Sequence, residues 1–151
     1  MRFITVLLLS VVVLSCDDDA PILDADIFYG TSFGECSGYC ITETRINDRA
    51  IQVIAKKWFN NDKDQQVANG QLTDEQHSSI LSGIDAEKFA DLPETIGCPD
   101  CADGGAEWLE LKVDGELKRV TFEYRDSING IDEAVKILRN LTEDLHPVYD
   151  Y

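Results

Sequence analysis

Two pairs of closely spaced cysteines constrain this chain more than any other feature of its sequence. Cys36 and Cys40 have three residues between them, in a stretch rich in glycine and aromatic residues, and Cys98 and Cys101 enclose a proline and an aspartate. A covalent or metal-mediated link within either pair fixes the shape of a short loop. The fold of this 151-residue chain must therefore accommodate two rigid loops. The cysteines thus indicate more about how the chain folds than about any activity.

The N-terminus has the pattern of a bacterial lipoprotein signal. After Arg2 comes a mainly apolar run over 3–14, which is too short to span a bilayer. The sequence Val13-Leu14-Ser15-Cys16 resembles a lipobox, in which the cysteine is acylated and becomes the first residue of the mature chain. We predict a signal peptide over 1–15 and lipidation of Cys16. The alternative is an ordinary secretory signal followed by an incidental cysteine.

An acidic segment follows the predicted lipidation site. Asp17-Asp18-Asp19 leads into a stretch with little periodicity, and we predict a flexible tether over 16–26. The acidic run resembles the surface-export signal of lipoproteins in Bacteroidetes-type bacteria. In enteric-type bacteria an aspartate there resembles an inner-membrane retention signal, and a tether without a sorting role is a third possibility. We expect a bacterial envelope protein anchored to the outer membrane by lipid, and exposed on the cell surface if the first interpretation holds.

The charge of the chain disfavours one class of partner. It has 13 basic and 29 acidic residues, and loss of residues 1–15 removes Arg2 alone among them, so the net charge changes from −16 to −17. Such a chain repels phosphate backbones, and we predict no nucleic-acid partner.

The length suits a single domain, which we place over 27–146 with a tail over 147–151.

Two hairpins are predicted from turn residues flanked by apolar runs. The first has strands over 39–46 and 49–59 around Asn47-Asp48, with Thr44 opposite Ile51. This pairing places Cys40 on the same face as Ile51, in the core. Residues 60–70 are polar and favour a loop or a ragged strand around 66–68.

The second hairpin has the stronger signal, because Asp114-Gly115 lies between strands over 108–113 and 116–124. It pairs Leu109 with Val120 on an apolar face. Glu110 and Arg119 then lie opposite each other on the other face.

Three helices are predicted from caps and apolar periodicity. Thr73 and Gln76 have the spacing of a capping box, and Gly83 ends that helix. Asp85 begins a short helix that ends before Pro93, and a last helix follows over 131–145. The fold class is therefore α+β, an antiparallel sheet of about four strands in two hairpins with helices on one face.

The four cysteines admit three kinds of chemistry. In an exported chain we expect two disulfides, and we favour the pairs Cys36–Cys40 and Cys98–Cys101 among the three possible connectivities, since closing a short loop costs the least entropy. A four-cysteine zinc site and an active redox pair are the alternatives. Acidic neighbours at Asp100 and Asp103 disfavour a reactive thiolate.

Several of these motifs together resemble a family of small bacterial lipoprotein domains of unknown function, of a Bacteroidetes-like type. The resemblance is carried by Phe33-Gly34-x-Cys36-x-Gly38-x-Cys40 before a strand, the Leu72-Thr73 helix start, Phe89 with Leu92-Pro93, and Val113-Asp114-Gly115. It covers roughly residues 26–145. It implies an α+β domain on an exported lipoprotein and supplies no activity and no catalytic residues.

Other candidate residues give weaker indications. Tyr39, Trp58 and Trp108 would form a binding patch if they were exposed together, or a satellite cluster if loops covered them. The two histidines, His77 and His146, are assigned solvated or capping roles rather than catalysis. No nucleophile elbow, zinc-protease or P-loop pattern occurs.

The sequence therefore favours a lipid-anchored, non-enzymatic domain that binds or scaffolds an unknown protein or small molecule. We predict no catalytic residues, no metal and no cofactor. The alternative is a thiol redox or zinc-handling protein that uses Cys36, Cys40, Cys98 and Cys101.

Overall fold

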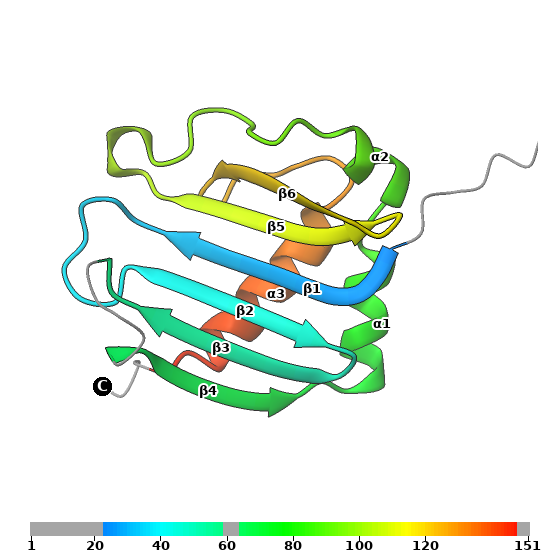
Figure 1. Ribbon diagram of the computed structural model, residues 1–151, viewed down its shortest axis with the longest axis horizontal. Helices are drawn as coiled ribbons and strands as arrows, with labels where there is room; N and C mark the ends of the chain where they lie inside the picture. The colour runs from blue at the N-terminus through cyan, green and yellow to red at the C-terminus, as the bar shows by residue number, and fades with distance from the viewer. Residues whose placement is uncertain (1–22, 59–63, 148–151) are drawn as a thin grey trace, which may run out of the picture.

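A computed structural model describes residues 23–58 and 64–147, with side chains described from residue 26 onward. The predicted signal peptide, Cys16, most of the predicted tether and most of the predicted tail lie outside these residues. Within them the chain forms one antiparallel sheet in the order β4-β3-β2-β1-β5-β6, and its helices lie on one face, so the α+β prediction is confirmed (Figure 1). The elements in chain order are β1 Leu23–Ser32, β2 Ile41–Asn47, β3 Ala50–Lys56, β4 Gln66–Gln71, α1 Asp74–Ser82, α2 Ala86–Asp91, the short 3₁₀ helix η2 Cys101–Asp103, β5 Ala106–Val113, β6 Glu116–Glu123 and α3 Asp132–Asp144.

The predicted number of four strands was too low, because β1 and β4 were not anticipated as full strands. β1 lies at the centre of the sheet, between β2 and β5, and begins at Leu23 within the segment that we expected to be tether. Ile27 and Tyr29 of β1 are buried on the helix-covered face. β4 is a polar edge strand with exposed side chains at most positions, so its sequence carries little strand signal.

The β5–β6 hairpin matches its prediction. Leu109 pairs with Val120 and both are fully buried, while Glu110 and Arg119 pair on the opposite face with their charged atoms 2.6 Å apart. Asp114 and Gly115 both have positive φ, of 51° and 83°, as a two-residue hairpin turn requires.

The β2–β3 hairpin exists, but its predicted register was wrong by two residues. Thr44 pairs with Val53 instead of Ile51, and the turn is Asp48-Arg49. This register sets Ile46 opposite Ile51, each 2% exposed, whereas the predicted one would have set Ile46 opposite a charged arginine. A shift of two keeps each side chain on its face. Cys40 is therefore buried, as predicted.

The helices begin and end where the capping residues predicted. Thr73 accepts a hydrogen bond from the Gln76 amide and the Gln76 side chain returns one to the Thr73 amide, while Gly83 is the C-cap of α1. Asp85 caps α2 by accepting a hydrogen bond from the Lys88 amide. None of the described helices is long and apolar enough to cross a membrane.

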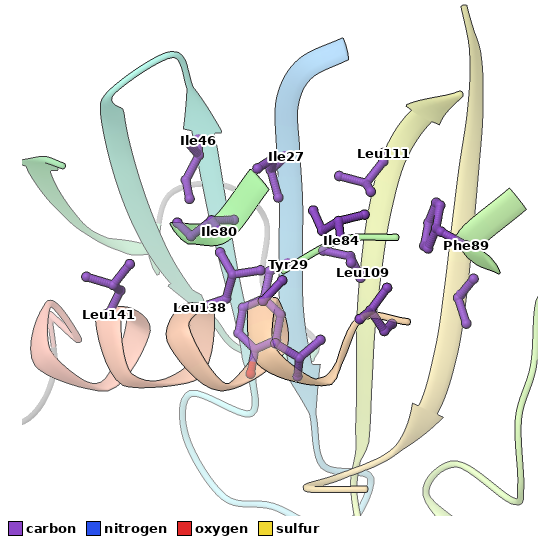
Figure 2. Packing of buried hydrophobic residues seen from close by; sticks show 14 of the residues in the cluster. Ile27, Tyr29, Ile46, Ile80, Ile84, Phe89, Leu109, Leu111, Leu138 and Leu141 are labelled. Carbon is purple, nitrogen blue, oxygen red and sulfur yellow. The ribbon is translucent and has the colours of Figure 1, made fainter. Parts of the chain in front are cut away.

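The core lies between the sheet and its helices (Figure 2). α3 crosses behind the sheet diagonally, and α1 and α2 cover the end where the hairpins turn (Figure 1). The buried cluster draws on β1, β2, β3, β5, β6 and all three helices, and includes Ile27, Tyr29, Ile46, Ile51, Ile80, Ile84, Phe89, Leu109, Leu111, Val120, Phe122, Ile131, Val135 and Leu138.

Candidate binding cleft

A cleft of about 340 Å³ opens at the end of the sheet opposite the hairpin turns. It is bounded by the 33–40 loop, the adjoining ends of β1 and β2, and the C-terminal half of α3 with the residues that follow it. This volume falls within the range of small-molecule sites. The elements that form it come from three distant parts of the chain.

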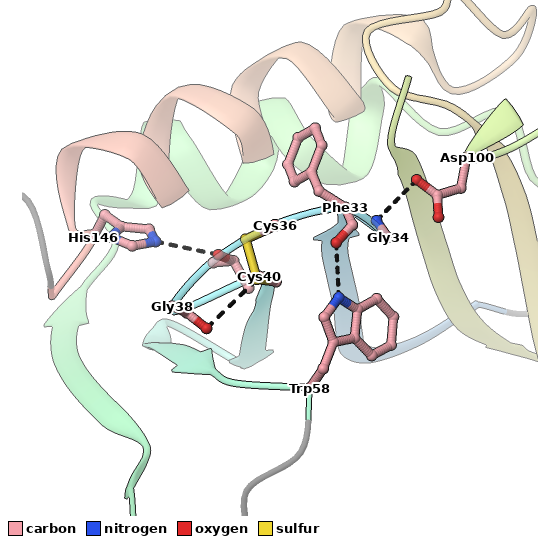
Figure 3. The surroundings of a disulfide bond; sticks show 9 residues. Phe33, Gly34, Cys36, Gly38, Cys40, Trp58, Asp100 and His146 are labelled. Carbon is pink, nitrogen blue, oxygen red and sulfur yellow. Dashed lines mark hydrogen bonds between the residues drawn. A yellow bond between two sulfur atoms is a disulfide. The ribbon is translucent and has the colours of Figure 1, made fainter. Parts of the chain in front are cut away.

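The first cysteine loop forms one wall of the cleft. Cys36 and Cys40 are joined by a disulfide, with their Cα atoms 5.6 Å apart (Figure 3). The Phe33 amide donates to the Cys40 carbonyl at 3.0 Å, and the Cys40 amide donates to the Lys56 carbonyl at 2.9 Å. The loop is thus closed covalently and fixed to β3.

The second cysteine loop braces the first. Cys98 and Cys101 form the other disulfide, so the favoured pairing is the one present. Asp100, between them, accepts a hydrogen bond from the Gly34 amide at 3.1 Å (Figure 3). A β-carbon at Gly34 would overlap the Asp100 carboxylate, so glycine permits this close approach. The structure thus divides the four cysteines between two disulfides in neighbouring loops.

Besides Tyr29, the aromatic rings of Phe33, Tyr39 and Tyr124 border the cleft. Phe33 and Tyr124 pack edge to face, with ring centroids 4.9 Å apart. The Tyr39 hydroxyl accepts a hydrogen bond from Gln66 at 3.1 Å, and the Lys57 ammonium lies 5.2 Å from the centre of its ring. These contacts hold the aromatic walls in fixed positions.

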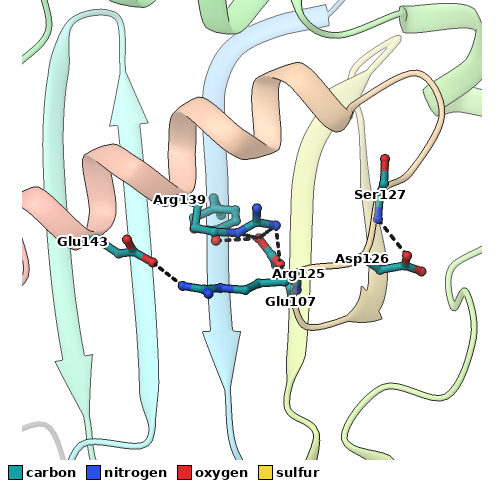
Figure 4. Close-up of polar contacts among 7 residues, drawn as sticks. Glu107, Arg125, Asp126, Ser127, Arg139 and Glu143 are labelled. Carbon is teal, nitrogen blue, oxygen red and sulfur yellow. Dashed lines mark hydrogen bonds and ion pairs between the residues drawn. The ribbon is translucent and has the colours of Figure 1, made fainter.

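A buried ion pair adjoins the cleft, because Arg139 and Tyr29 border it and both form hydrogen bonds with Glu107. Glu107 is fully buried, and Arg139 of α3 donates to both of its carboxylate oxygens, at 2.9 and 3.0 Å (Figure 4). Tyr29 donates its hydroxyl hydrogen to the same carboxylate at 2.6 Å, and the Arg125 amide donates to it at 2.8 Å. A buried charge is tolerated only with such full pairing.

The same network shifts the ionisation of its members. Burial raises the pKa of Tyr29 far above its ordinary value, and the negative charge of Glu107 adds to the effect. Burial by itself would lower the pKa of Arg139, but the bonds to Glu107 outweigh burial and raise it. Tyr29 is therefore a neutral donor and Arg139 a permanent cation.

Hydroxyl groups and a histidine line the rest of the cleft. Nε2 of His146 lies 3.1 Å from the Thr42 hydroxyl. The hydroxyl of Thr142, which also borders the cleft, lies 2.6 Å from that of the buried Thr44. Burial lowers the pKa of His146 below its ordinary value, so its imidazole is neutral at pH 7. His146 therefore contacts the sheet and borders the cleft, beyond the solvated or capping role expected for it.

The three aromatic residues proposed as a patch are separated in the structure. Tyr39 borders the cleft, whereas Trp58 lies beside a second hollow, of about 420 Å³, across the first cysteine loop. Trp58 is 42% exposed and donates its indole N–H to the Phe33 carbonyl at 2.7 Å. Trp108 is only 9% exposed on the helix-free face, because it packs over Gly30 and under the Arg119 guanidinium. One exposed patch of all three is therefore excluded.

Sequence reasoning missed the ion pair that adjoins the cleft, although both partners carried a signal. Glu107 occupies the first position of the alternation that continues with Leu109 and Leu111, on the apolar face of β5. Arg139 follows Leu138 and lies next to Val135 on the helix surface, four residues away. Opposite charges at the margins of two apolar faces indicate a buried pair.

Compared with known proteins, the sequence matches no protein-family model and no curated protein. Its resemblance to a lipoprotein domain family therefore stays a prediction.

Proposed function

We propose that this protein is a lipid-anchored domain of the bacterial outer membrane that binds a partner in the cleft without altering it chemically. The observation that carries the proposal is the cleft itself, whose walls are fixed by two disulfide-closed loops. A preformed cleft reduces the entropy lost when a ligand binds. The lipidated Cys16 would supply the contact with the membrane.

The acid–base groups that border or adjoin the cleft favour binding over catalysis. Both carboxylate oxygens of Glu107 are engaged by Arg139, Tyr29 and the Arg125 amide. The hydroxyl within reach of His146 belongs to Thr42, whose side chain is itself buried. A nucleophile or general base must reach its substrate, and these groups are committed to the fold.

The anchor is tested by replacing Cys16 with alanine. The variant should leave the membrane fraction or accumulate unprocessed, because a lipidated chain is held by its buried methylene groups. The matched control is Asp18→Asn, which keeps the thiol and should still sediment with membranes. Unchanged maturation and fractionation of Cys16→Ala would rule out the lipoprotein proposal.

A thiol and metal assay distinguishes the proposed function from the alternative, a thiol redox or zinc-handling protein. Mature protein purified in air should contain no free thiol among Cys36, Cys40, Cys98 and Cys101, and no stoichiometric zinc. One zinc per chain with reactive thiols after its removal would favour the alternative.

A further inference from the structure

We propose that the cleft binds a neutral, polyhydroxylated ligand, namely a sugar unit of a glycan. This inference rests on the proposed function, in which the cleft is the binding site. Three properties of the lining carry it: its charge balance, its hydrogen-bonding groups and its aromatic walls.

The charges that border the cleft are already paired within the protein. Arg139 is bound by Glu107, and Glu143 lies 3.3 Å from the guanidinium of Arg125. His146 is neutral at pH 7 for the reason given above. The cleft therefore provides no uncompensated charge for an ionic ligand, and the strongly acidic chain as a whole disfavours anions. The pairing of these charges therefore favours a neutral ligand.

The lining is rich in hydroxyl groups, which both donate and accept hydrogen bonds. Thr31 and Ser37 border the cleft, and their hydroxyls make no side-chain hydrogen bond within the described parts of the chain. Sugar hydroxyls have the same dual character and match such groups in either direction. A site built from hydroxyl partners discriminates against ligands that lack them, because its polar groups would be left unpaired.

The aromatic walls of the cleft suit the apolar faces of a sugar ring. A sugar ring has hydroxyls at its edge and C–H groups on its faces, so it requires polar and apolar surface within a few ångströms. Tyr39 and Tyr124 offer an apolar ring with a polar tip, and Phe33, which packs against Tyr124, extends the apolar surface. The small volume of the cleft favours one sugar unit or the end of a chain over a long glycan lying flat.

The test uses mature, full-length protein in detergent micelles and follows its amide resonances by NMR. The probes are glucose, galactose, mannose and N-acetylglucosamine, with glucuronate as an anionic probe and trialanine as a peptide probe. We expect at least one neutral sugar to shift the resonances of Thr31, Ser37 and Tyr39. Glucuronate and trialanine should leave these resonances unchanged.

Variants locate the binding. Tyr39→Ala and Thr31→Val should each weaken sugar binding, the first by about tenfold or more, as for an aromatic hot-spot residue. The matched control is Leu117→Ala, an exposed apolar residue near the β5–β6 turn, which should bind like the wild type. Melting temperatures of the variants separate lost binding from lost folding.

The outcomes distinguish the two proposals. Shifts at the cleft with trialanine or glucuronate, and with none of the sugars, would overturn the sugar assignment and leave the cleft as a binding site. Sugar binding undiminished in both Tyr39→Ala and Thr31→Val would place the site elsewhere and overturn both proposals. Absence of any shift at the cleft with every probe would likewise contradict both.

Discussion

The helix-covered face of the sheet has two halves that are stabilised differently. The half nearest the hairpin turns is apolar, with Ile27 and Leu111 of the sheet packed in the same core as Ile80 of α1 and Phe89 of α2 (Figure 2). Burial of such side chains contributes about 1.5–3 kcal/mol each and requires no particular orientation. Loss of one contact there lowers stability without leaving a polar group unpaired.

The half nearest the cysteine loops has polar groups in the equivalent layer. Glu107 and Thr44 of the sheet form hydrogen bonds with Arg139 and Thr142 of α3, respectively. Tyr29 donates its own hydrogen bond to Glu107 within the sheet. Such groups are tolerated only when every bond is made. The comparison indicates that one half of the core stabilises the fold and the other fixes the geometry of the cleft.

Removing one partner of the buried ion pair should have the largest effect. Glu107→Ala leaves Arg139 as an uncompensated charge, and we expect a loss of about 3–5 kcal/mol in the free energy of unfolding. Denaturant unfolding of the mature protein measures it. The double variant Glu107→Leu with Arg139→Met should recover part of the loss, because it removes both charges but leaves the Tyr29 hydroxyl and the Arg125 amide without their acceptor. A single variant within about 1 kcal/mol of wild type would mean that the two halves do not differ as described.

A core truncation in the apolar half should have a similar or smaller effect. Leu111 is 1% exposed, and Leu111→Ala should cost about 2–5 kcal/mol through lost burial and a residual cavity. Leu117→Ala, exposed on the neighbouring strand, is the control and should stay within about 0.5 kcal/mol. A loss of that small size for Leu111→Ala would contradict its assignment to the core.

The sequence predicted the parts of the fold that depend on local chemistry. Asp114-Gly115 specifies a two-residue turn by itself, and the register of β5–β6 follows from it. Asp48 is compatible with two adjacent turns, and the choice between them depends on pairing Ile46 with Ile51 against the helices. The turn residues alone allow two registers, and burial of side chains against the helices selects the observed one.

Contacts between residues that lie far apart in the sequence could not be predicted from local chemistry. β1 is central because it pairs with β5, and Tyr29 meets Glu107 across 78 positions of the chain. The two disulfides followed from close spacing, but the contact that joins their loops, Gly34 with Asp100, spans 66 positions. The cleft arises where these long-range contacts meet, so its loops were anticipated and its shape was not.

A hydroxyl pair gives a milder test of the polar half. Thr142→Val leaves the buried Thr44 hydroxyl without its partner, and we expect a loss of about 1–3 kcal/mol. The double variant Thr44→Val with Thr142→Val removes both groups and should be closer to wild type than the single one. Additive losses in a double-mutant cycle would show that the two hydroxyls act independently.

The smallest effect concerns pH and is confined to the alkaline range. Tyr29 has its pKa raised above the ordinary 10.0 by burial and by Glu107, so its contribution to stability is complete below pH 10. Above pH 10 the unfolded phenol loses its proton while the folded one keeps it. Stability should then fall by up to about 1.4 kcal/mol per pH unit on account of this group.

Tyr29→Phe removes that titration, so its free energy of unfolding should approach that of the wild type as the pH rises from 10 to 11. The control is Tyr39→Phe, which keeps Tyr29 and should keep the alkaline slope of the wild type. Urea unfolding at a series of alkaline pH values measures both slopes. Equal slopes for Tyr29→Phe and wild type would mean that Tyr29 ionises as readily in the folded protein as in the unfolded chain. The polar half of the face would then be open to water, and the contrast with the apolar half would fail at its central residue.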